Sequence, residues 1–582
     1  ADATIFLDPL AEVPLNERQN EVALRTIRDH PHLFDIVTPI NVDRFKQLLV
    51  GHPNRALVDS VVRSLREGAW PWADTSDPAL PTTWDNMTKP LSKPEDVAFA
   101  RQQCEMEVEL RRFSPPFGPA LLPGMYGVPI HVVPKPGSSK KRLVVDHSAG
   151  AHPLNGMIPK ARGFVHLDNL ELFGAILRRV RRKYGRDAKL VVWKSDVAQA
   201  YRRIPMHPLW QIRQTVFING YRYVDRDNNF GDRAAGAIWI AFFSLVIWIA
   251  IYVKLLADLL EYVDDVFSWE FAGAWDYYEP YQDYFPSKQV AFLCLLDELG
   301  IPHERPKQLY GEQLEIIGFV VDPNAMTITM SASSKSELIA ALRGFALPHT
   351  RRSLREFQQV GGWCNWSFNV HPLLRPGLCT LYHKMRGKTQ SNATISVSAR
   401  LRRELLWMAD HMSHLPGVRM LESDEWGDGD EDVRLLADAS GVGLGFWCPS
   451  RGTGFQCVRP GSPMPVGIFY NEALAVLSAL HHAVFDIDPQ PRRILIFSDN
   501  TNTVDMFNSM RADQTHNRIL MTAVDTLLNF DCELRVFHIP GTDNSVADAL
   551  SRFDNQRALQ LIPGLKVRTF LPPQLTKGAD LK

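Results

Sequence analysis

The chain has 582 residues, 45% of them hydrophobic, and a formal net charge of −1 at pH 7. This length predicts about four domains, and the composition is ordinary for a packed globular protein. The near-zero net charge argues against a chain that binds nucleic acid through its overall charge, although local basic clusters can still neutralise phosphates. The seven cysteines form no C-x-x-C pair, which favours a reduced, intracellular protein in the cytoplasm or nucleus.

The first 90 residues predict a helical extension. Helical patterns are expected at Asn16–Asp29, Val42–Val50 and Ala56–Arg66. They carry no catalytic pattern, so the sequence leaves their role open.

Residues 128–146 predict a β-hairpin with a basic tip. The prolines in Val128–Lys135 cannot donate to a β-ladder, which favours an edge strand. Pro136–Ser139 is typical of a turn, and Arg142–Asp146 is the returning strand. Further on, Arg178–Arg186 carries six cations in nine residues. Such runs are either solvated faces or local phosphate sites.

Three carboxylates in the next segment indicate metal chemistry. The apolar strand Lys189–Trp193 leads into Asp196, and Asp264 and Asp265 lie between two apolar runs. An acid on a strand and an acid pair on a hairpin can meet and hold two divalent cations. Two cations ~3.5–4 Å apart clamp the attacking and leaving oxygens of a phosphoryl transfer.

An uncharged run, Ile238–Val253, precedes the acid pair. Its sixteen residues fall short of the ~20 needed to span a bilayer. We therefore expect a buried helix that supports the hairpin, and no membrane partner.

A hairpin is predicted at Glu315–Asp322 and Thr327–Met330, followed by helices from Ser333 to about Leu415. The acidic segment Glu422–Asp432 is typical of a linker. A second α/β unit follows from Val433 to about Phe553, and the proline-containing tail after it is expected to be extended or disordered.

Residues 120–330 together resemble a reverse transcriptase. The resemblance rests on the basic hairpin, Leu154–Lys160, Asp196, Tyr201 and the Asp264–Asp265 pair in the family's order. It implies a metal set of Asp196, Val197, Asp264 and Asp265, with Mg²⁺ or Mn²⁺ as the cation. It implies dNTP contacts at Lys135, Lys141, Arg142, Tyr201, Phe230, Gly231 and Lys307. Gly318 falls in the family's primer-grip hairpin.

Tyr201 matches the family's bulky steric gate, whose ring occupies the space that a ribose 2′-OH needs. Core packing is the alternative for this side chain. One departure from the family's pattern stands at Asn229–Arg233, where a Pro-Phe-Gly-Leu-like turn is usual. There, Asp232 is expected to bring a negative charge near the triphosphate.

The second α/β unit resembles RNase H over about 120 residues. Its acids occur in the order Asp438, Glu472, Asp499 and Asp548, on a predicted strand, helix, strand and helix. The resemblance implies that these acids bind two Mg²⁺ that activate water against an RNA phosphodiester. His538 matches a mobile histidine of the family, and a purely structural role is its alternative.

The order of the two units resembles a retroelement polyprotein. Ser498–Val504 and His538–Arg552 lean toward DIRS-type elements, which use a tyrosine recombinase, and any recombinase is expected beyond residue 582. The expected fold is α+β and multidomain: a right-hand polymerase of fingers, palm and thumb, then an α/β RNase H-like domain. The expected domains are 1–90, a helical extension; 91–330, fingers and palm; 331–417, a helical thumb or connection; 418–432, an acidic linker; 433–555, RNase H; and 556–582, an extended tail.

The implied partners are an RNA or DNA template-primer, RNA/DNA hybrids and dNTPs. One rival is an RNA-dependent RNA polymerase, which Tyr201 and the RNase H unit disfavour. A second rival is a decayed or domesticated element that binds hybrids without catalysis. Asp232 motivates this second rival, and the retained acids disfavour it.

Overall fold

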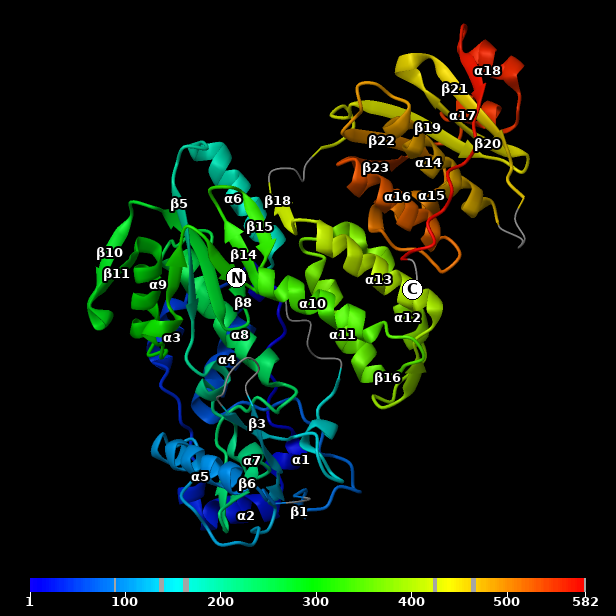
Figure 1. Ribbon diagram of the computed structural model, residues 1–582. Helices are drawn as coiled ribbons and strands as arrows, with labels where there is room; N and C mark the ends of the chain where they lie inside the picture. Colours follow the sequence, from blue (N-terminus) through cyan, green and yellow to red (C-terminus); the bar gives the residue numbers. More distant parts are fainter. Residues whose placement is uncertain (88–89, 135–140, 161–166, 422–425, 462–466, 580–582) are drawn as a thin grey trace. The chain divides into compact units, whose positions relative to one another are not determined.

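The computed structural model describes the chain apart from residues 88–89, 135–140, 161–166, 422–425, 462–466 and 580–582. It is a mixed α+β protein with several sheets (Figure 1). It divides into two compact units. The first holds residues 1–317 and 322–325, and the second holds residues 318–321 and 326–582.

The expected helices of the first 90 residues are present, and they belong to the core of the first unit. Asparagine side chains cap α2, α3 and α4 by accepting a backbone N–H of the first turn. Phe45 packs on Phe242 with ring centroids 5.2 Å apart. These helices and the following α5 are α1 Leu15–Arg18, α2 Glu21–Asp29, α3 Val42–Leu48, α4 Arg55–Glu67 and α5 Pro94–Glu109.

The central sheet of the first unit has the order β12-β5-β9-β8, and every neighbouring pair is antiparallel. Its strands are β5 Leu190–Asp196, β8 Leu260–Tyr262, β9 Asp265–Phe271 and β12 Leu309–Gly311. Trp193 packs against Phe292 of α9 (Ser287–Glu298), and Phe267 packs against Phe173 of α6 (Leu170–Tyr184). Since successive strand side chains point to opposite faces, these two helices cover opposite faces of the sheet.

The uncharged run forms the buried helix expected for it. It makes up α8, Ala235–Trp248, and a π-helical turn, Ile249–Val253. Trp239 and Phe243 are fully buried. This helix and α14 (Ile468–Phe485) are long and apolar enough to cross a membrane by length and composition, and both are mostly buried inside the protein.

The expected basic hairpin consists of β3 Ile130–Pro134 and β4 Lys141–Val145, with Val133 opposite Arg142. A hairpin that sequence reasoning missed follows the acid pair, as β10 Trp275–Tyr278 and β11 Asp283–Pro286. A four-stranded sheet completes the first unit with β1 Trp84–Asp85, β2 Tyr126–Gly127, β6 Thr215–Ile218 and β7 Tyr221–Val224.

The second unit begins with short strands and helices. Its helices are α10 Ala332–Phe345, α11 Leu354–Ser367, α12 Cys379–Met385 and α13 Ala399–His414. Val418–Met420 forms β18, which pairs with β15 (Thr327–Met330). The first three residues of the predicted linker 418–432 are therefore a strand, because their backbone bonds to a partner some 90 residues earlier. Of the acidic part, residues 422–425 lie outside the described residues.

A six-stranded sheet of order β23-β22-β19-β20-β21-β24 follows. The pairs β19/β20 and β20/β21 are antiparallel, whereas β19/β22, β22/β23 and β21/β24 are parallel. Helix α14 packs against β19, β20 and β22. The strands are β19 Val433–Ala439, β20 Gly443–Cys448, β21 Thr453–Val458, β22 Arg493–Ser498, β23 Glu533–His538 and β24 Lys566–Thr569. The remaining helices are α15 Thr501–Ser509, α16 Asn517–Asn529, α17 Ser545–Ser551 and α18 Asn555–Leu561.

The tail predicted to be extended or disordered is helical up to Leu561, in α18. Strand β24 follows, and Leu565 is buried with Leu550 and Ala558. The tail then runs along α16, where Arg518 donates to the carbonyls of Leu575 and Thr576 at 2.9 Å. Apolar burial and an open strand edge order this segment.

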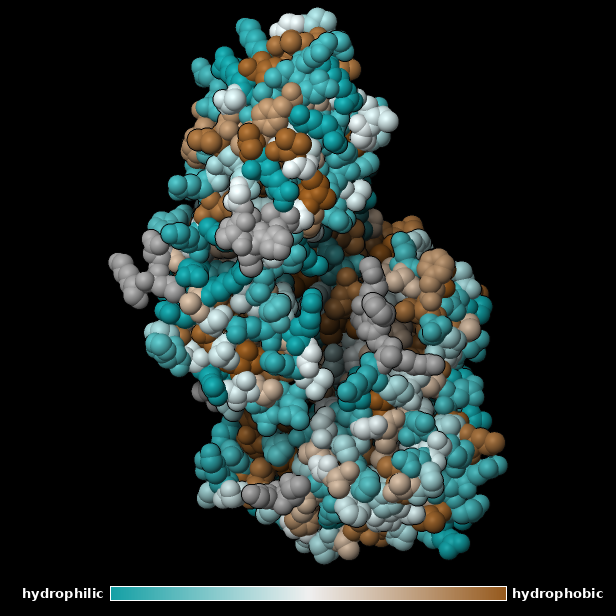
Figure 2. All heavy atoms as spheres, turned by 90° about the vertical axis from the view of Figure 1, so that its right-hand side faces the viewer, coloured by the Kyte–Doolittle hydropathy of each residue, from teal (hydrophilic) through white to brown (hydrophobic). Residues whose placement is uncertain are grey.

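On the face drawn in Figure 2, hydrophilic side chains are mixed with scattered hydrophobic ones.

Candidate active sites

The strand pair β5/β9 brings the first three acids together. Asp196 is the last residue of β5, and its register partner across the sheet is Asp265, the first residue of β9. Asp264 lies in the two-residue turn between β8 and β9, because Tyr262 pairs directly with Asp265. Paired residues share a face of the sheet, so Asp196 and Asp265 point the same way. Val197 follows Asp196 and is buried.

The turn that carries Asp264 is strained. Val263 has a φ of 62°, in the left-handed region that β-branched residues rarely adopt. The indole N–H of Trp239 in α8 donates to the Val263 carbonyl oxygen at 2.8 Å. The buried helix therefore holds the turn in a conformation that the sequence of the turn disfavours.

Two lysines lie beside the acids. Lys307 Nζ is 2.9 Å from Asp196 Oδ2, and Lys194 Nζ is 3.8 Å from Asp265 Oδ2. Burial, together with the nearby Asp196 and Asp265 carboxylates, raises the pKa of Asp264 to about 6. Carboxylates crowded in this way favour positive charge between them, so the site fits divalent cations.

Two aromatic rings lie next to the acids. Tyr201 and Phe230 have ring centroids 4.8 Å apart, and 65% of Phe230 is exposed. Burial and the Asp264 carboxylate raise the pKa of Tyr201. Gly231 is required by close packing, since a Cβ there would lie 2.0 Å from the Val145 carbonyl oxygen at the end of β4. The predicted nucleotide contacts Tyr201, Phe230 and Gly231 are thus neighbours in space.

Asp232 differs from the expectation of a charge facing a triphosphate. Its carboxylate is buried and accepts the Ala234 N–H at 2.7 Å, at the start of α8. The buried His147 lies 3.9 Å away, and burial raises the pKa of Asp232 to about 7. Asp232 turns inward, and its carboxylate is bonded to the backbone just before α8 instead of facing solvent.

The basic hairpin shows where its cations point. Lys141 Nζ is 2.7 Å from Asp96 Oδ1 in α5. Arg142, the next residue of β4, points to the opposite face and is exposed. Lys135 lies outside the described residues.

Gly318, in the second unit, has a φ of 79°, and a Cβ there would lie 3.1 Å from the Trp366 ring.

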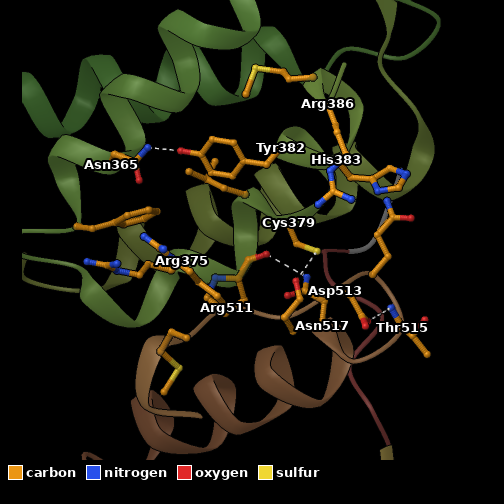
Figure 3. A pocket seen from close by; sticks show the side chains of 17 residues that line it. Asn365, Arg375, Cys379, Tyr382, His383, Arg386, Arg511, Asp513, Thr515 and Asn517 are labelled. Carbon is orange, nitrogen blue, oxygen red and sulfur yellow. Dashed lines mark hydrogen bonds between the residues drawn. The ribbon is translucent and has the colours of Figure 1, made fainter. Parts of the chain in front are cut away.

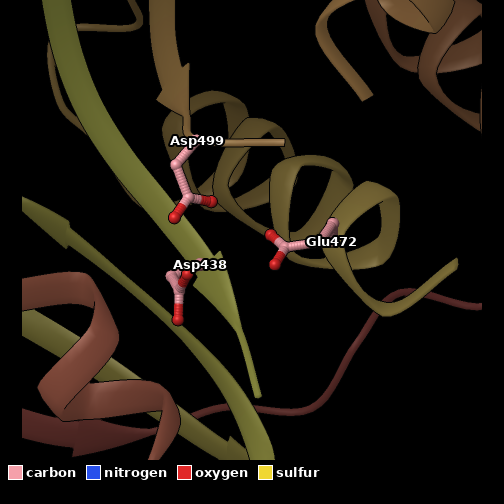
Figure 4. A group of neighbouring side chains, drawn as sticks. All are labelled: Asp438, Glu472 and Asp499. Carbon is pink, nitrogen blue, oxygen red and sulfur yellow. The ribbon is translucent and has the colours of Figure 1, made fainter. Parts of the chain in front are cut away.

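A second acid cluster lies on the six-stranded sheet. Asp438 of β19, Glu472 of α14 and Asp499 at the end of β22 have ligand oxygens that all lie within 4.8 Å of one another (Figure 4). Among the described residues, this is the one group of metal-ligand side chains that meets so closely. The parallel pairing of β19 and β22 places the two aspartates side by side.

The electrostatics of this cluster also fit a cation. Burial, together with the neighbouring Asp438 and Asp499, raises the pKa of Glu472 to about 9. Burial likewise raises the pKa of Asp438 to about 6, against a hydrogen bond from Ser551. Glu472 Oε2 is buried without a hydrogen-bond partner. Buried acids that ionise reluctantly, as Glu472 and Asp438 do, are suited to divalent cations.

Asp548 is not part of that three-acid group. Its two oxygens are bound by Arg552 Nε at 2.6 Å and Arg557 Nη1 at 2.7 Å. The arginines lower the pKa of Asp548, although burial opposes them. His538 is exposed at the end of β23, opposite Ser498 and hence one residue from Asp499 in register.

Sequence reasoning missed two residues that place α17 against the cluster. Gly445 of β20 is the register partner of Asp438, and a Cβ there would lie 2.5 Å from the Ser551 nitrogen. Ser551 Oγ donates to Asp438 Oδ2 at 2.6 Å. The available signal was the alternation of glycine in Gly443-Leu444-Gly445, which is typical of close backbone approach in a strand.

A cavity of about 950 Å³ lies elsewhere in the second unit (Figure 3). It lies between residues 365–386 and residues 510–517, and its cationic lining includes Arg375, Arg386 and Arg511. Cys379 Sγ donates to the Ala512 carbonyl at 3.3 Å, and Trp407 of α13 donates to Asp525 of α16 at 2.7 Å. The helices within residues 354–414 thus form direct hydrogen bonds to the part of the second unit that holds the six-stranded sheet.

No family model matches the chain, and no curated protein matches it. Among solved structures, the chain is similar to the foamy viral protease-reverse transcriptase in complex with an RNA/DNA hybrid. That match has a TM-score of 0.44 and 14% identity, and covers 96% of this chain and 68% of the other. The double-stranded DNA complex of the same viral protein matches with a TM-score of 0.43 and 14% identity, over 92% and 98% of the two chains.

Proposed function

We propose that this chain is an RNA- and DNA-templated DNA polymerase, a reverse transcriptase, with a fused RNase H that degrades the RNA of RNA/DNA hybrids. The observation that carries the proposal is the presence of two separate acid clusters on adjacent strands. The first has Tyr201 and Phe230 beside it, and the second lies on a mixed sheet with Asp438 at its centre. Each cluster suits one phosphoryl transfer.

In the polymerase site, Asp196, Asp264, Asp265 and Val197 would hold the cations. In the nuclease site, Asp438, Glu472, Asp499 and Asp548 would hold them. Bound there, Mg²⁺ or Mn²⁺ supplies positive charge opposite the reacting phosphate oxygens. The two lysines beside the first cluster neutralise carboxylates, and in this proposal Lys307, 2.9 Å from Asp196, also meets the triphosphate.

The nucleotide-binding side chains have separate roles. The Tyr201 ring stands where a ribose 2′-OH would lie, and Phe230 and Gly231 pack on the nucleotide. Lys135, Lys141 and Arg142 of the basic hairpin offset the charge of the triphosphate. His538 assists proton transfer or product release in the nuclease site.

The partners proposed are an RNA or DNA template-primer, RNA/DNA hybrids and dNTPs, and the setting is intracellular replication of a retrotransposon. The fingers, palm and thumb correspond to residues 91–417 in this proposal. The segments Ser498–Val504 and His538–Arg552 support the DIRS type. Asp232 was the reason for considering a decayed element without catalysis. Because Asp232 is buried near the start of α8, it no longer supports that alternative.

The test is primer extension on a 5′-labelled RNA template with Mg²⁺ and dNTPs. Wild type, Asp264→Asn and Asp438→Asn are compared in one assay. We expect Asp264→Asn to lose extension and keep template cleavage, and Asp438→Asn to do the reverse. Hybrid binding by wild type with neither reaction would refute the proposal.

A further inference from the structure

A buried ionic cluster lies behind the two aromatic rings of the polymerase site. Its members are Glu107, Arg112, Arg202 and Asp225, whose side chains are 14%, 3%, 8% and 0% exposed. Glu107 joins both arginines at 2.6 Å, and Arg202 Nη1 binds Asp225 Oδ1 at 2.7 Å. Charge-assisted hydrogen bonds of this kind are strong and directional when water is excluded.

One side of this buried ionic cluster holds the backbone that carries Tyr201. Arg202 directly follows Tyr201, and Arg112 Nη1 donates to the side-chain oxygen of Gln199. Gln199 has a φ of 53°, in the left-handed region. The arginines therefore fix a short segment whose conformation is otherwise unfavourable, and the ring of Tyr201 projects from it.

The other side holds the turn that carries Phe230. Asp225 Oδ2 accepts from Asn229 Nδ2 at 2.8 Å, and Asn229 Oδ1 accepts the Gly231 N–H at 2.9 Å. Asp225 thus binds Arg202 with one oxygen and Asn229 with the other. Its carboxylate is the bridge between the two segments whose rings meet at 4.8 Å.

We propose that Asp225 is a positioning residue that sets the sugar selectivity of the polymerase, because it holds the Tyr201 ring against Phe230 from behind. The inference rests on the proposed function of that site. A Tyr201 ring held in one place leaves room for deoxyribose and excludes a 2′-OH through steric contact. When the bridge is broken, the Tyr201 ring moves more easily, and ribonucleotides enter.

Two variants break the bridge at different places. Asp225→Asn keeps the shape but replaces one acceptor oxygen with a donor, so it cannot accept from both Arg202 and Asn229. Glu107 still pairs with Arg202 in that variant, so the guanidinium keeps a counter-charge. Asn229→Ala leaves all four charges of the buried ionic cluster in place and removes the two hydrogen bonds of the Asn229 side chain, to Asp225 and to Gly231. If Asp225→Asn does not fold, Asn229→Ala still tests the inference.

The matched control is Glu17→Gln. Glu17 Oε1 binds Arg213 Nη2 at 2.7 Å, with side chains 3% and 8% exposed, so it is a comparable buried acid in the same unit. It takes no part in the contacts of Tyr201 or Phe230 described here. The measurement is the ratio of kcat/KM for dNTP to kcat/KM for rNTP in single-nucleotide extension.

We expect Asp225→Asn and Asn229→Ala each to lower that ratio about tenfold, and Glu17→Gln to leave it unchanged. In a Tyr201→Ala background, where the gate is already absent, Asp225→Asn should not change the ratio further. Equal loss of dNTP and rNTP incorporation would reduce Asp225 to a structural residue and overturn the inference, while the proposed function stands. If wild type extends with neither nucleotide, the proposed function itself fails.

Discussion

At the scale of single residues, the two acid clusters neutralise their charge in partly different ways. Lysines stand beside the acids of the first cluster, at 2.9 Å from Asp196 and 3.8 Å from Asp265, and the pKa of Asp264 there is raised to about 6. In the second cluster, the pKa is raised to about 9 at Glu472 and to about 6 at Asp438, and arginines bind the neighbouring Asp548. A cation therefore competes with lysines and protons at the first cluster and mainly with protons at the second.

Lys307→Met should make the first cluster easier to fill. Removal of the ammonium group leaves Asp196 without its counter-charge, so the Mg²⁺ concentration that gives half of the maximal thermal stabilisation should fall about threefold. Differential scanning fluorimetry against Mg²⁺ measures this. Lys254→Met, which breaks the pair with Glu298, is the control and should change nothing. A higher Mg²⁺ requirement for Lys307→Met would contradict the prediction.

Asp232→Asn should stabilise the protein in a pH-dependent way. The pKa of Asp232 is raised to about 7 from 3.8, so the folded state binds its proton more tightly, and this stability is lost as pH rises from about 4 to about 7. The amide avoids the buried charge and still accepts the Ala234 N–H. We expect a gain on the order of 2–4 kcal/mol at pH 8 that shrinks as pH falls and vanishes near pH 4.

Urea unfolding followed by tryptophan fluorescence at several pH values measures that gain. The neighbouring His147, whose pKa burial lowers to about 3, is present in both proteins and cancels in the difference. Asp146→Asn, at a side chain that is 35% exposed, is the control. Parallel stability curves for wild type and Asp232→Asn would refute the argument.

At the scale of elements, glycine in β20 decides how closely α17 approaches the acids of the second cluster. A Cβ at Gly445 would lie 2.5 Å from the Ser551 nitrogen and 2.8 Å from the Ala547 carbonyl oxygen. Both are backbone atoms and cannot rotate away. The position of Asp548 beside Asp438 therefore depends on a residue that carries no functional group.

Gly445→Ala should displace α17 and slow hybrid cleavage about tenfold or more, with primer extension retained. The overpacking should also lower the stability of the sheet unit by about 1–3 kcal/mol. Gly441→Ala, where a Cβ meets nothing within 4 Å, is the matched control. Cleavage of a labelled hybrid and thermal unfolding give the two readouts, and cleavage at the wild-type rate would disprove the role of the glycine.

At the scale of the whole molecule, the C-terminal segment belongs to the fold of the second unit. Strand β24 covers the edge of β21, Phe570 packs on Phe446 with centroids 4.9 Å apart, and the residues after it bond to α16. An uncovered edge of this kind is a site of intermolecular pairing.

Truncation after Pro563 should therefore destabilise the sheet unit by about 3 kcal/mol, mainly through loss of buried Leu565, and promote aggregation. Truncation after Phe570 keeps β24 and should retain hybrid cleavage. Thermal unfolding and light scattering distinguish the two proteins. Equal behaviour of the two truncated chains would show that β24 adds nothing.

The sequence was sufficient for the local features of both sites. Apolar runs beside the acids predicted β5 and the hairpin that carries the acid pair, and the uncharged run predicted α8. The same logic placed Asp438, Glu472 and Asp499 on a strand, a helix and a strand end. These predictions held because hydrophobic periodicity is encoded within a few residues.

Features that depend on distant partners were not predictable in this way. Strands β18 and β24 are three and four residues long, and each exists because of a partner strand far away in sequence. The inward direction of the Asp232 side chain depends on its burial near the start of α8. The bridge of Asp225 between Arg202 and Asn229 joins side chains that give no motif of their own.

The left-handed backbone conformation of Val263 implies that selection for thermal stability and selection for catalysis favour different residues at this position. A backbone conformation of this kind costs on the order of 1–3 kcal/mol, and glycine at residue 263 would relieve it. Directed evolution for heat resistance alone should therefore enrich Val263→Gly, and those survivors should synthesise DNA poorly because the greater backbone freedom of glycine loosens the turn that carries Asp264. Selection for synthesis should restore a side chain at residue 263, so the residue reports which trait a population has been selected for.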